Sequence, residues 1–268
     1  MGRYVYYANG GIVPIIGDDY EETKRKLSGK VLIAIGDSYT VGMANHLQSL
    51  CNKYGMILDA RGVTGSTIRE GGSNPMCSRV DVIVQDYESG RSIDGVTYYK
   101  SDVGVITFMG GTNDGASINV IGGGLNETAT TTVYGALHHI FYSLLKEFTK
   151  ATVICISQPA NYYLSASSTV TTEAAAQVLG FDSVAQAQLL DDVQFTSYCC
   201  NRTQTAVKKS ALMYGAELID MFSEMPPISN PSNKSAYWAS DKIHLNSAGY
   251  LIVVNAIEKK LLEMFGAS

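Results

Sequence analysis

Short runs rich in β-branched residues alternate with longer amphipathic segments from Lys30 to the end of the chain. This alternation is typical of a parallel sheet, because each strand reaches its neighbour through a crossover helix. The runs are apolar along their whole length, which predicts that each strand is buried on both faces. The predicted strands span residues 31–35, 56–60, 103–109, 152–157 and 216–220.

Helical periodicity fills the segments between these strands. Together, five strands and five helices predict an α/β fold: a three-layer α/β/α sandwich with a central, mainly parallel sheet of five strands, as in flavodoxin-like proteins. The predicted helices cover residues 41–54, 76–86 and 133–148, lie within 183–214, and cover 247–265.

Two segments and the N-terminus depart from this pattern. Residues 1–29 are rich in Tyr and Gly and then in charged residues, so we expect an N-terminal extension followed by one domain over 30–268. Residues 87–102 contain Gly among polar neighbours and predict a loop or hairpin insertion. Residues 158–182 follow a strand's carboxyl end, where open α/β sheets bind ligands, and predict a lid or substrate wall.

Composition excludes several classes of function. The net charge of −5 provides no basic surface for nucleic acid or for anionic lipid, so neither is an expected partner. The apolar runs are far shorter than the ~20 residues of a membrane-spanning helix. The first seven residues lack the apolar core of a secretory signal, but compartment stays open between cytoplasm and secretion with a signal removed. Oligomeric state is not predicted.

The five cysteines are an odd number without metal-ligand spacing. We therefore expect most of them to be reduced and buried, with no metal bound by them.

A serine follows the first predicted strand at the point where a helix begins. In Gly36-Asp37-Ser38-Tyr39-Thr40 the hydroxyl of Ser38 would point into the ligand crevice, and its N–H would lie at a helix N-terminus. A plain helix cap would use the same residue types. The α/β-hydrolase elbow requires Gly where Thr40 stands, and a P-loop ending is absent. A flavodoxin-like loop that binds a cofactor phosphate is a further interpretation of this segment.

Near the C-terminus, Asp241 and His244 are three residues apart before the last helix. This spacing allows the carboxylate to accept a proton from one imidazole nitrogen while the other acts as a base. A surface turn with Asp241 as a cap is the alternative. The other histidines lack a carboxylate at comparable spacing and are expected to be structural: His46, His138 and His139.

Two further segments follow predicted strands. Gly110 and Gly111 precede Asn113, whose amide can donate to an oxyanion, although a β-turn would use similar residues. Gly65 lies just beyond the second strand and can supply a backbone N–H. These two segments and Ser38 all lie at carboxyl ends of predicted parallel strands, and the pair Asp241 and His244 lies just ahead of the last helix. We therefore expect these four segments to meet at one edge of the sheet.

Taken together, these residues resemble the SGNH hydrolases, the GDSL-like esterase and lipase family, from about Lys30 to the C-terminus. The resemblance implies Ser38 as nucleophile, His244 as base and Asp241 as its partner. It also implies an oxyanion hole of Ser38, Gly65 and Asn113, with Gly62 as a rival to Gly65. Tyr39 departs from the leucine of the family name, and we expect this position to affect packing or pocket shape more than chemistry.

The resemblance implies a serine esterase that forms an acyl-enzyme without a cofactor. O-acetyl or other short acyl groups are the expected substrates, on a small molecule or a carbohydrate. A lipase or thioesterase within the family, and a non-catalytic carbohydrate-binding module on the same fold, are the alternatives. The predicted substrate contacts are Tyr39, Thr112 and Trp238, with Tyr162, Tyr163 and Tyr237 near the crevice.

Overall fold

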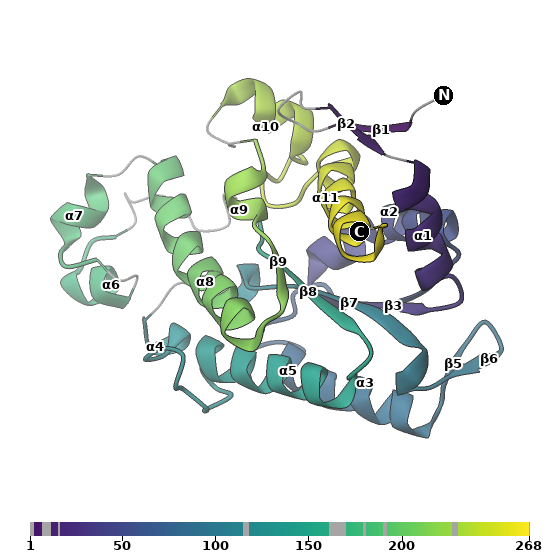
Figure 1. Cartoon of the computed structure of the whole chain (residues 1–268). Helices are drawn as coiled ribbons and strands as arrows, with labels where there is room; N and C mark the ends of the chain where they lie inside the picture. The colour runs from purple at the N-terminus through teal and green to yellow at the C-terminus, as the bar shows by residue number, and fades with distance from the viewer. Residues whose placement is uncertain are drawn as a thin grey trace.

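A five-stranded parallel sheet forms the centre of the molecule (Figure 1). The structure, a computed structural model, describes residues 3–6, 12–15, 17–114, 118–160, 170–178, 181–189, 192–226 and 230–267. All four strand pairs of the sheet are parallel, in the order β4-β3-β7-β8-β9. The strands are β3 (Val31–Gly36), β4 (Ile57–Gly62), β7 (Val103–Met109), β8 (Thr152–Ile156) and β9 (Glu217–Ile219).

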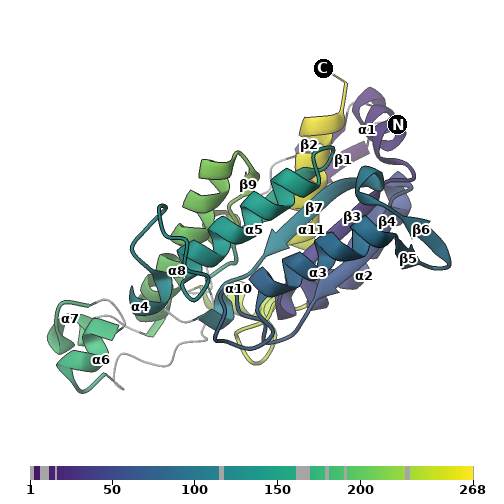
Figure 2. The ribbon, with the colours of Figure 1, turned by 90° about the horizontal axis from the view of Figure 1, so that it is seen from below.

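Helices cover both faces of this sheet, which confirms the predicted three-layer α/β/α architecture (Figures 1 and 2). One layer consists of α1 (Gly17–Leu27), α2 (Ser38–Tyr54) and α11 (Ser247–Phe265). The other consists of α3 (Met76–Ser89), α5 (Val133–Glu147) and α8 (Asp192–Tyr214).

Successive side chains of β3 point alternately to the two helix layers. Ile33 and Ile35 pack in the core beneath α3 and α5, whereas Leu32 and Ala34 pack in the core beneath α2 and α11. Every residue of β3 and of β7 is buried, as their uninterrupted apolar sequences predicted. The same prediction is wrong for β4, where Asp59 alone is buried, because β4 lies at the edge of the sheet.

The segment over residues 87–102 contains the predicted hairpin. Strands β5 (Arg91–Ile93) and β6 (Val96–Tyr98) pair antiparallel, after α3 has extended three residues beyond its predicted end to Ser89. The N-terminal residues contain a second antiparallel pair, β1 (Arg3–Tyr6) and β2 (Ile12–Ile15). Leu27 of α1 is buried in the core with α2 and α11. The boundary between residues 29 and 30 stays a prediction.

Short helices complete the described chain. Two of them, α6 and α7, enclose a small core of Val170, Ala176, Phe181 and Ala187 that projects from the sheet (Figure 1, left). They belong to or follow the segment predicted as a lid, of which residues 161–169 and 179–180 lie outside the described residues. The short helices are η1 (Lys100–Asp102), η2 (Thr112–Asp114), α4 (Ile118–Ile121), α6 (Glu173–Val178), α7 (Val184–Gln188), α9 (Met221–Glu224) and α10 (Pro231–Tyr237).

The strand order places a topological switch point at β3. After β3 the chain forms β4 on one side of it, and later forms β7 on the other side. The loops that follow these strands therefore run in opposite directions, and a ligand-binding crevice is expected where they separate. Those loops carry Ser38, Gly65 and Asn113. No helix within the described ranges has the length and apolarity needed to cross a membrane.

Candidate active site

Ser38 is the first residue of α2, directly after β3. Asp37 caps the helix by accepting a hydrogen bond from the N–H of Tyr39 at 3.0 Å. A side chain at Gly36 would meet Thr40 Oγ1 at 2.1 Å and Met109 O at 2.3 Å, so only glycine fits the turn between strand and helix. Ser38 is half-buried between buried neighbours at the carboxyl edge of the sheet.

His244 and Asp241 reach Ser38 from the loop between α10 and α11. His244 Nε2 lies 2.8 Å from Ser38 Oγ, and His244 Nδ1 lies 2.6 Å from Asp241 Oδ2. A bridge between Trp238 and Leu245 closes the base of this loop. The structure therefore joins hydroxyl, imidazole and carboxylate in one hydrogen-bonded line, across 206 residues of chain.

Asp241 also organises the backbone of its own turn. Its Oδ1 accepts the N–H groups of Ile243 at 2.9 Å and His244 at 3.0 Å. Partial burial raises the pKa of the Asp241 carboxyl, but these bonds and the bond from the His244 ring outweigh it and hold that pKa below its ordinary value. The ionised carboxylate fixes the tautomer in which Nδ1 carries the proton and Nε2 is free to accept one from Ser38.

Gly65 and Asn113 lie on the loops after β4 and β7. Gly65 has a φ of +75° and open space where a Cβ would stand, whereas a Cβ at its rival Gly62 would lie 2.9 Å from Val41 N. Asn113 Nδ2 donates to the carbonyl of Ser66 at 3.0 Å, which ties the two loops together and leaves its second N–H for another acceptor. Gly65 stays the predicted second oxyanion donor, with Gly62 as its rival.

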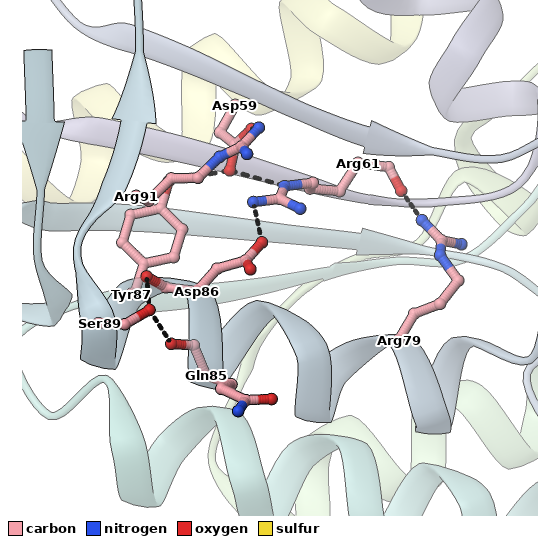
Figure 3. A network of polar contacts seen from close by, with 8 residues as sticks. All are labelled: Asp59, Arg61, Arg79, Gln85, Asp86, Tyr87, Ser89 and Arg91. Atoms are coloured by element: carbon pink, nitrogen blue, oxygen red, sulfur yellow. Dashed lines mark hydrogen bonds and ion pairs between the residues drawn. The ribbon is translucent and has the colours of Figure 1, made fainter. Parts of the chain in front are cut away.

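Arg79 of α3 ties the loop of Gly65 to the strands beside it. Its guanidinium donates to Gly36 O at 3.3 Å and to Ser66 Oγ at 3.0 Å. It also donates to the carbonyl of Arg61, as Figure 3 shows. These acceptors belong to the ends of β3 and β4 and to the residue after Gly65. One planar cation therefore holds three backbone segments around the crevice, a role that only its fork of donors allows.

A second polar network supports the edge strand (Figure 3). The buried carboxylate of Asp59 accepts from Arg61 Nε at 2.7 Å, from Tyr87 Oη at 3.0 Å and from Arg91 at 3.2 Å. Arg61 also contacts Asp86 of α3 at 2.7 Å. The network fastens α3 and the β5–β6 hairpin to β4, and so fixes the helix that carries Arg79.

Gln158, two residues after the end of β8, connects the turn before Ser38 to the loop of Asn113. Its Oε1 accepts from the N–H of Thr112 at 2.7 Å and from Thr112 Oγ1 at 2.6 Å, and its Nε2 donates to Asp37 Oδ2 at 2.7 Å. Burial raises the pKa of Asp37 to about 6, against the hydrogen bonds from Tyr39 and Gln158. Sequence reasoning missed Gln158, because a single glutamine after a strand forms no recognisable pattern.

Asp114 fixes the loop after β4 from the other side. Its carboxylate accepts the N–H of Ile68 at 2.8 Å and that of Arg69 at 3.1 Å, in a buried position beside Asn113. Burial raises the pKa of Asp114 to about 7, although these backbone bonds oppose it. The loop that carries Gly65 is therefore anchored by Asp114 as well as by Arg79.

The raised pKa predicts a pH-dependent stability difference between the protein and Asp114→Asn, whose amide oxygen can still accept the backbone bonds. Because folded Asp114 binds its proton more tightly than the unfolded chain does, ionising it costs folding free energy. The stability of the wild-type protein relative to the variant should fall as pH rises from about 4 to about 7, by up to about 1.4 kcal/mol per pH unit. Urea unfolding of both proteins at pH 4.5, 6 and 7.5 measures this, and a pH-independent difference would contradict it.

The three predicted substrate contacts are buried in the structure, and their role in binding substrate stays a prediction. Tyr39 has no exposed surface, Trp238 is 4% exposed and Thr112 is 9% exposed. Tyr39 and Trp238 pack in the core with α2 and α11, and both polar groups of Thr112 bind Gln158. Tyr162 and Tyr163 lie outside the described residues, and Tyr237 packs half-buried against the same core.

The remaining histidines bridge neighbouring helices. His46 lies 3.0 Å from Ser247 of α11, His139 lies 2.8 Å from Asp81 of α3, and His138 contacts Tyr214 of α8. Asp81 is thus a carboxylate that the sequence spacing around His139 did not reveal.

Three of the cysteines, Cys51, Cys77 and Cys155, are free and buried. The side chains of Cys199 and Cys200 are not among those described. Within the described part of the chain, no cluster of three His, Cys, Asp or Glu side chains forms a metal site.

The chain matches known proteins in sequence family and in fold. A family model described as the GDSL-like lipase/acylhydrolase family matches residues 34–252, which is most of the chain and includes both Ser38 and His244. The chain belongs to the GDSL-like lipase/acylhydrolase family. It is therefore a hydrolase. None of the curated proteins matches it in sequence.

Several solved structures share the fold of this GDSL-like hydrolase. A protein from Lactobacillus plantarum is 19% identical with a TM-score of 0.63, over 89% of this chain and 99% of its own. A possible lipase from Chitinophaga pinensis is 16% identical with a TM-score of 0.51, over 87% and 98%. Est24, a carbohydrate acetylesterase from Sinorhizobium meliloti, is 12% identical with a TM-score of 0.51, over 88% and 100%. At these identities the likeness establishes the fold alone.

Proposed function

We propose that this GDSL-like hydrolase is a serine esterase that cleaves short acyl esters, O-acetyl groups on carbohydrate among them, through an acyl-enzyme at Ser38. The observation that carries the proposal is the line of hydrogen bonds from Ser38 Oγ through His244 to Asp241, with contacts of 2.8 and 2.6 Å. A binding module has no need of a base that is oriented by a carboxylate. The carbohydrate class is supported by Est24, a carbohydrate acetylesterase that shares the fold.

In the acylation step, His244 Nε2 accepts the proton of Ser38 as Oγ attacks the ester carbonyl carbon. The carbonyl oxygen becomes an oxyanion, and we assign its donors as the N–H groups of Ser38 and Gly65 and the free N–H of the Asn113 amide. Removing one such donor typically lowers kcat by about 10²- to 10³-fold. His244 then gives its proton to the departing alkoxide, which leaves as an alcohol.

Deacylation repeats these steps with water in place of the alcohol. His244 Nε2 accepts a proton from water as its oxygen attacks the acyl carbon, and the same donors meet the oxyanion. Ser38 Oγ leaves, recovers the proton from His244, and the carboxylic acid is released. Throughout, Asp241 stays ionised and stabilises the imidazolium, in line with its lowered pKa.

The test is hydrolysis of p-nitrophenyl esters of graded chain length, alongside acetylated sugars, followed by mass spectrometry of acid-quenched enzyme. We expect turnover of p-nitrophenyl acetate, a decline in kcat/KM as the acyl chain lengthens, and an acetyl group on the peptide that contains Ser38. Preference for long chains would instead indicate a lipase. Failure to cleave any of these esters, with no acetylated Ser38, would reject the esterase.

A further inference from the structure

Tyr39 follows the nucleophile, yet its side chain turns away from the crevice and into the protein. Its ring has no exposed surface and packs edge-on against Tyr250, with ring centroids 6.3 Å apart. Its ring centroid lies 6.0 Å from that of His244. Its hydroxyl donates to the carbonyl of Ile243 at 2.5 Å, across 204 residues of chain. The hydroxyl of residue 39 thus binds the peptide group that directly precedes His244.

The turn that holds His244 is bonded mainly to residues of its own loop, such as Ala239, whose N–H donates to the carbonyl of His244 at 2.9 Å. The hydrogen bonds that Asp241 receives come from Ile243 and His244, which belong to the same turn, and the Asp241 side chain is 45% exposed. Lys242 has a φ of +61°, a left-handed conformation that costs a non-glycine residue free energy. The bond from Tyr39 ties this turn to α2, the helix that carries Ser38.

Acylation changes which of these contacts can hold His244. Once Ser38 Oγ carries an acyl group it has no proton to donate, so the Ser38–His244 hydrogen bond is lost. Neither the Tyr39 hydroxyl nor the Ile243 carbonyl takes part in the reaction, so their bond persists in the acyl-enzyme. It then links the imidazole to α2 while His244 Nε2 waits for water.

We infer that Tyr39 is a positioning residue for His244 that acts chiefly in deacylation, an inference that rests on the proposed acyl-enzyme mechanism. A leucine, the residue in the family name, has no group that could make this bond. The tyrosine in Gly36-Asp37-Ser38-Tyr39 thus does not contact substrate. It holds His244 close to α2 during deacylation, when acylated Ser38 can no longer donate a hydrogen bond to His244.

The test is Tyr39→Phe, which removes the hydroxyl and keeps the ring. With p-nitrophenyl acetate, whose good leaving group makes acylation fast, kcat should fall about three- to tenfold, the value of one hydrogen bond. The ratio kcat/KM, which reports acylation, should stay within about twofold. Acid-quenched Tyr39→Phe enzyme should carry more acetyl at Ser38 in the steady state than the wild-type protein does.

Tyr54→Phe is the matched control. Tyr54 is a buried tyrosine on the same helix, and its hydroxyl donates to Glu258 at 2.7 Å at the end of α2 away from the site. Its variant should lose a similar amount of stability and keep the wild-type kcat and kcat/KM. A merely structural role for Tyr39 would make the two variants alike.

Three results would overturn the inference: an unchanged kcat in Tyr39→Phe, an equal fall in kcat and kcat/KM, or the same loss of kcat in Tyr54→Phe. In each of these the wild-type protein still turns over ester, so the esterase itself stands. Lack of turnover and of acetyl-enzyme in the wild-type protein would reject the proposed function, and the role of Tyr39 with it.

Discussion

Replacing Ser38 with alanine is expected to lower kcat for p-nitrophenyl acetate by roughly 10⁴- to 10⁶-fold, because no other group in the hydrogen-bonded line can form the acyl-enzyme. His244→Ala should cost about as much, since the serine hydroxyl is a weak nucleophile without its base at 2.8 Å. The double variant should lose little more than either single one, because the two residues act as one unit.

Ser49→Ala is the matched control for Ser38→Ala. Ser49 lies on the exposed face of the same helix, where its hydroxyl bonds to the carbonyl of Asn45, and its loss should leave turnover unchanged. Steady-state kinetics of the four variants and the wild-type protein measure these effects. Turnover by Ser38→Ala at the wild-type rate would remove Ser38 as nucleophile, and additive losses in the double variant would show that Ser38 and His244 act separately.

Replacing Gln158 with leucine is expected to lower the free energy of unfolding by about 3–5 kcal/mol, the largest stability effect we predict. The substitution keeps the side-chain size but removes the acceptor for both polar groups of Thr112 and the donor to Asp37 Oδ2. Asp37 is fully buried, so its carboxylate would lose a partner where water cannot replace it. The helix cap before Ser38 and the loop before Asn113 would then lose their shared support.

Gln48→Leu is the control for this substitution. Gln48 lies on the exposed face of α2 and contacts only a neighbouring turn, with its amide 2.9 Å from Asn52, so its loss should change stability by no more than about 0.5 kcal/mol. Urea unfolding at pH 7.5 compares both variants with the wild-type protein. Equal stabilities of Gln158→Leu and Gln48→Leu would show that the buried amide does not support the site.

Local sequence patterns predicted the central strands and the turn residues at their ends. Uninterrupted apolar runs gave β3 and β7 to within one residue, because a strand buried on both faces needs such a run whatever lies around it. The turn residues at Gly36, Asn113 and His244 were recognisable because their chemistry depends on residue type and short spacing. The exposed edge of β4 was not predicted, since an edge strand and a central one can have similar sequences.

The residues that support the site could not be predicted from the sequence. Gln158, Arg79 and Asp114 act on backbone groups that lie far from them in the chain, and backbone groups carry no sequence signal. Tyr39 was predicted to contact substrate, because its position beside Ser38 does not reveal which way its ring turns. Only the packing of α11 against α2 directs that ring inward.

Residue type and periodicity are local properties, and they specify which groups are available for chemistry and at which strand ends those groups stand. Tertiary structure decided the order of the strands, the 2.8 Å contact between Ser38 and His244, and the buried bonds that hold both loops. Distances between segments that are 206 residues apart depend on how two helix layers pack on one sheet, and that packing is a property of the whole chain.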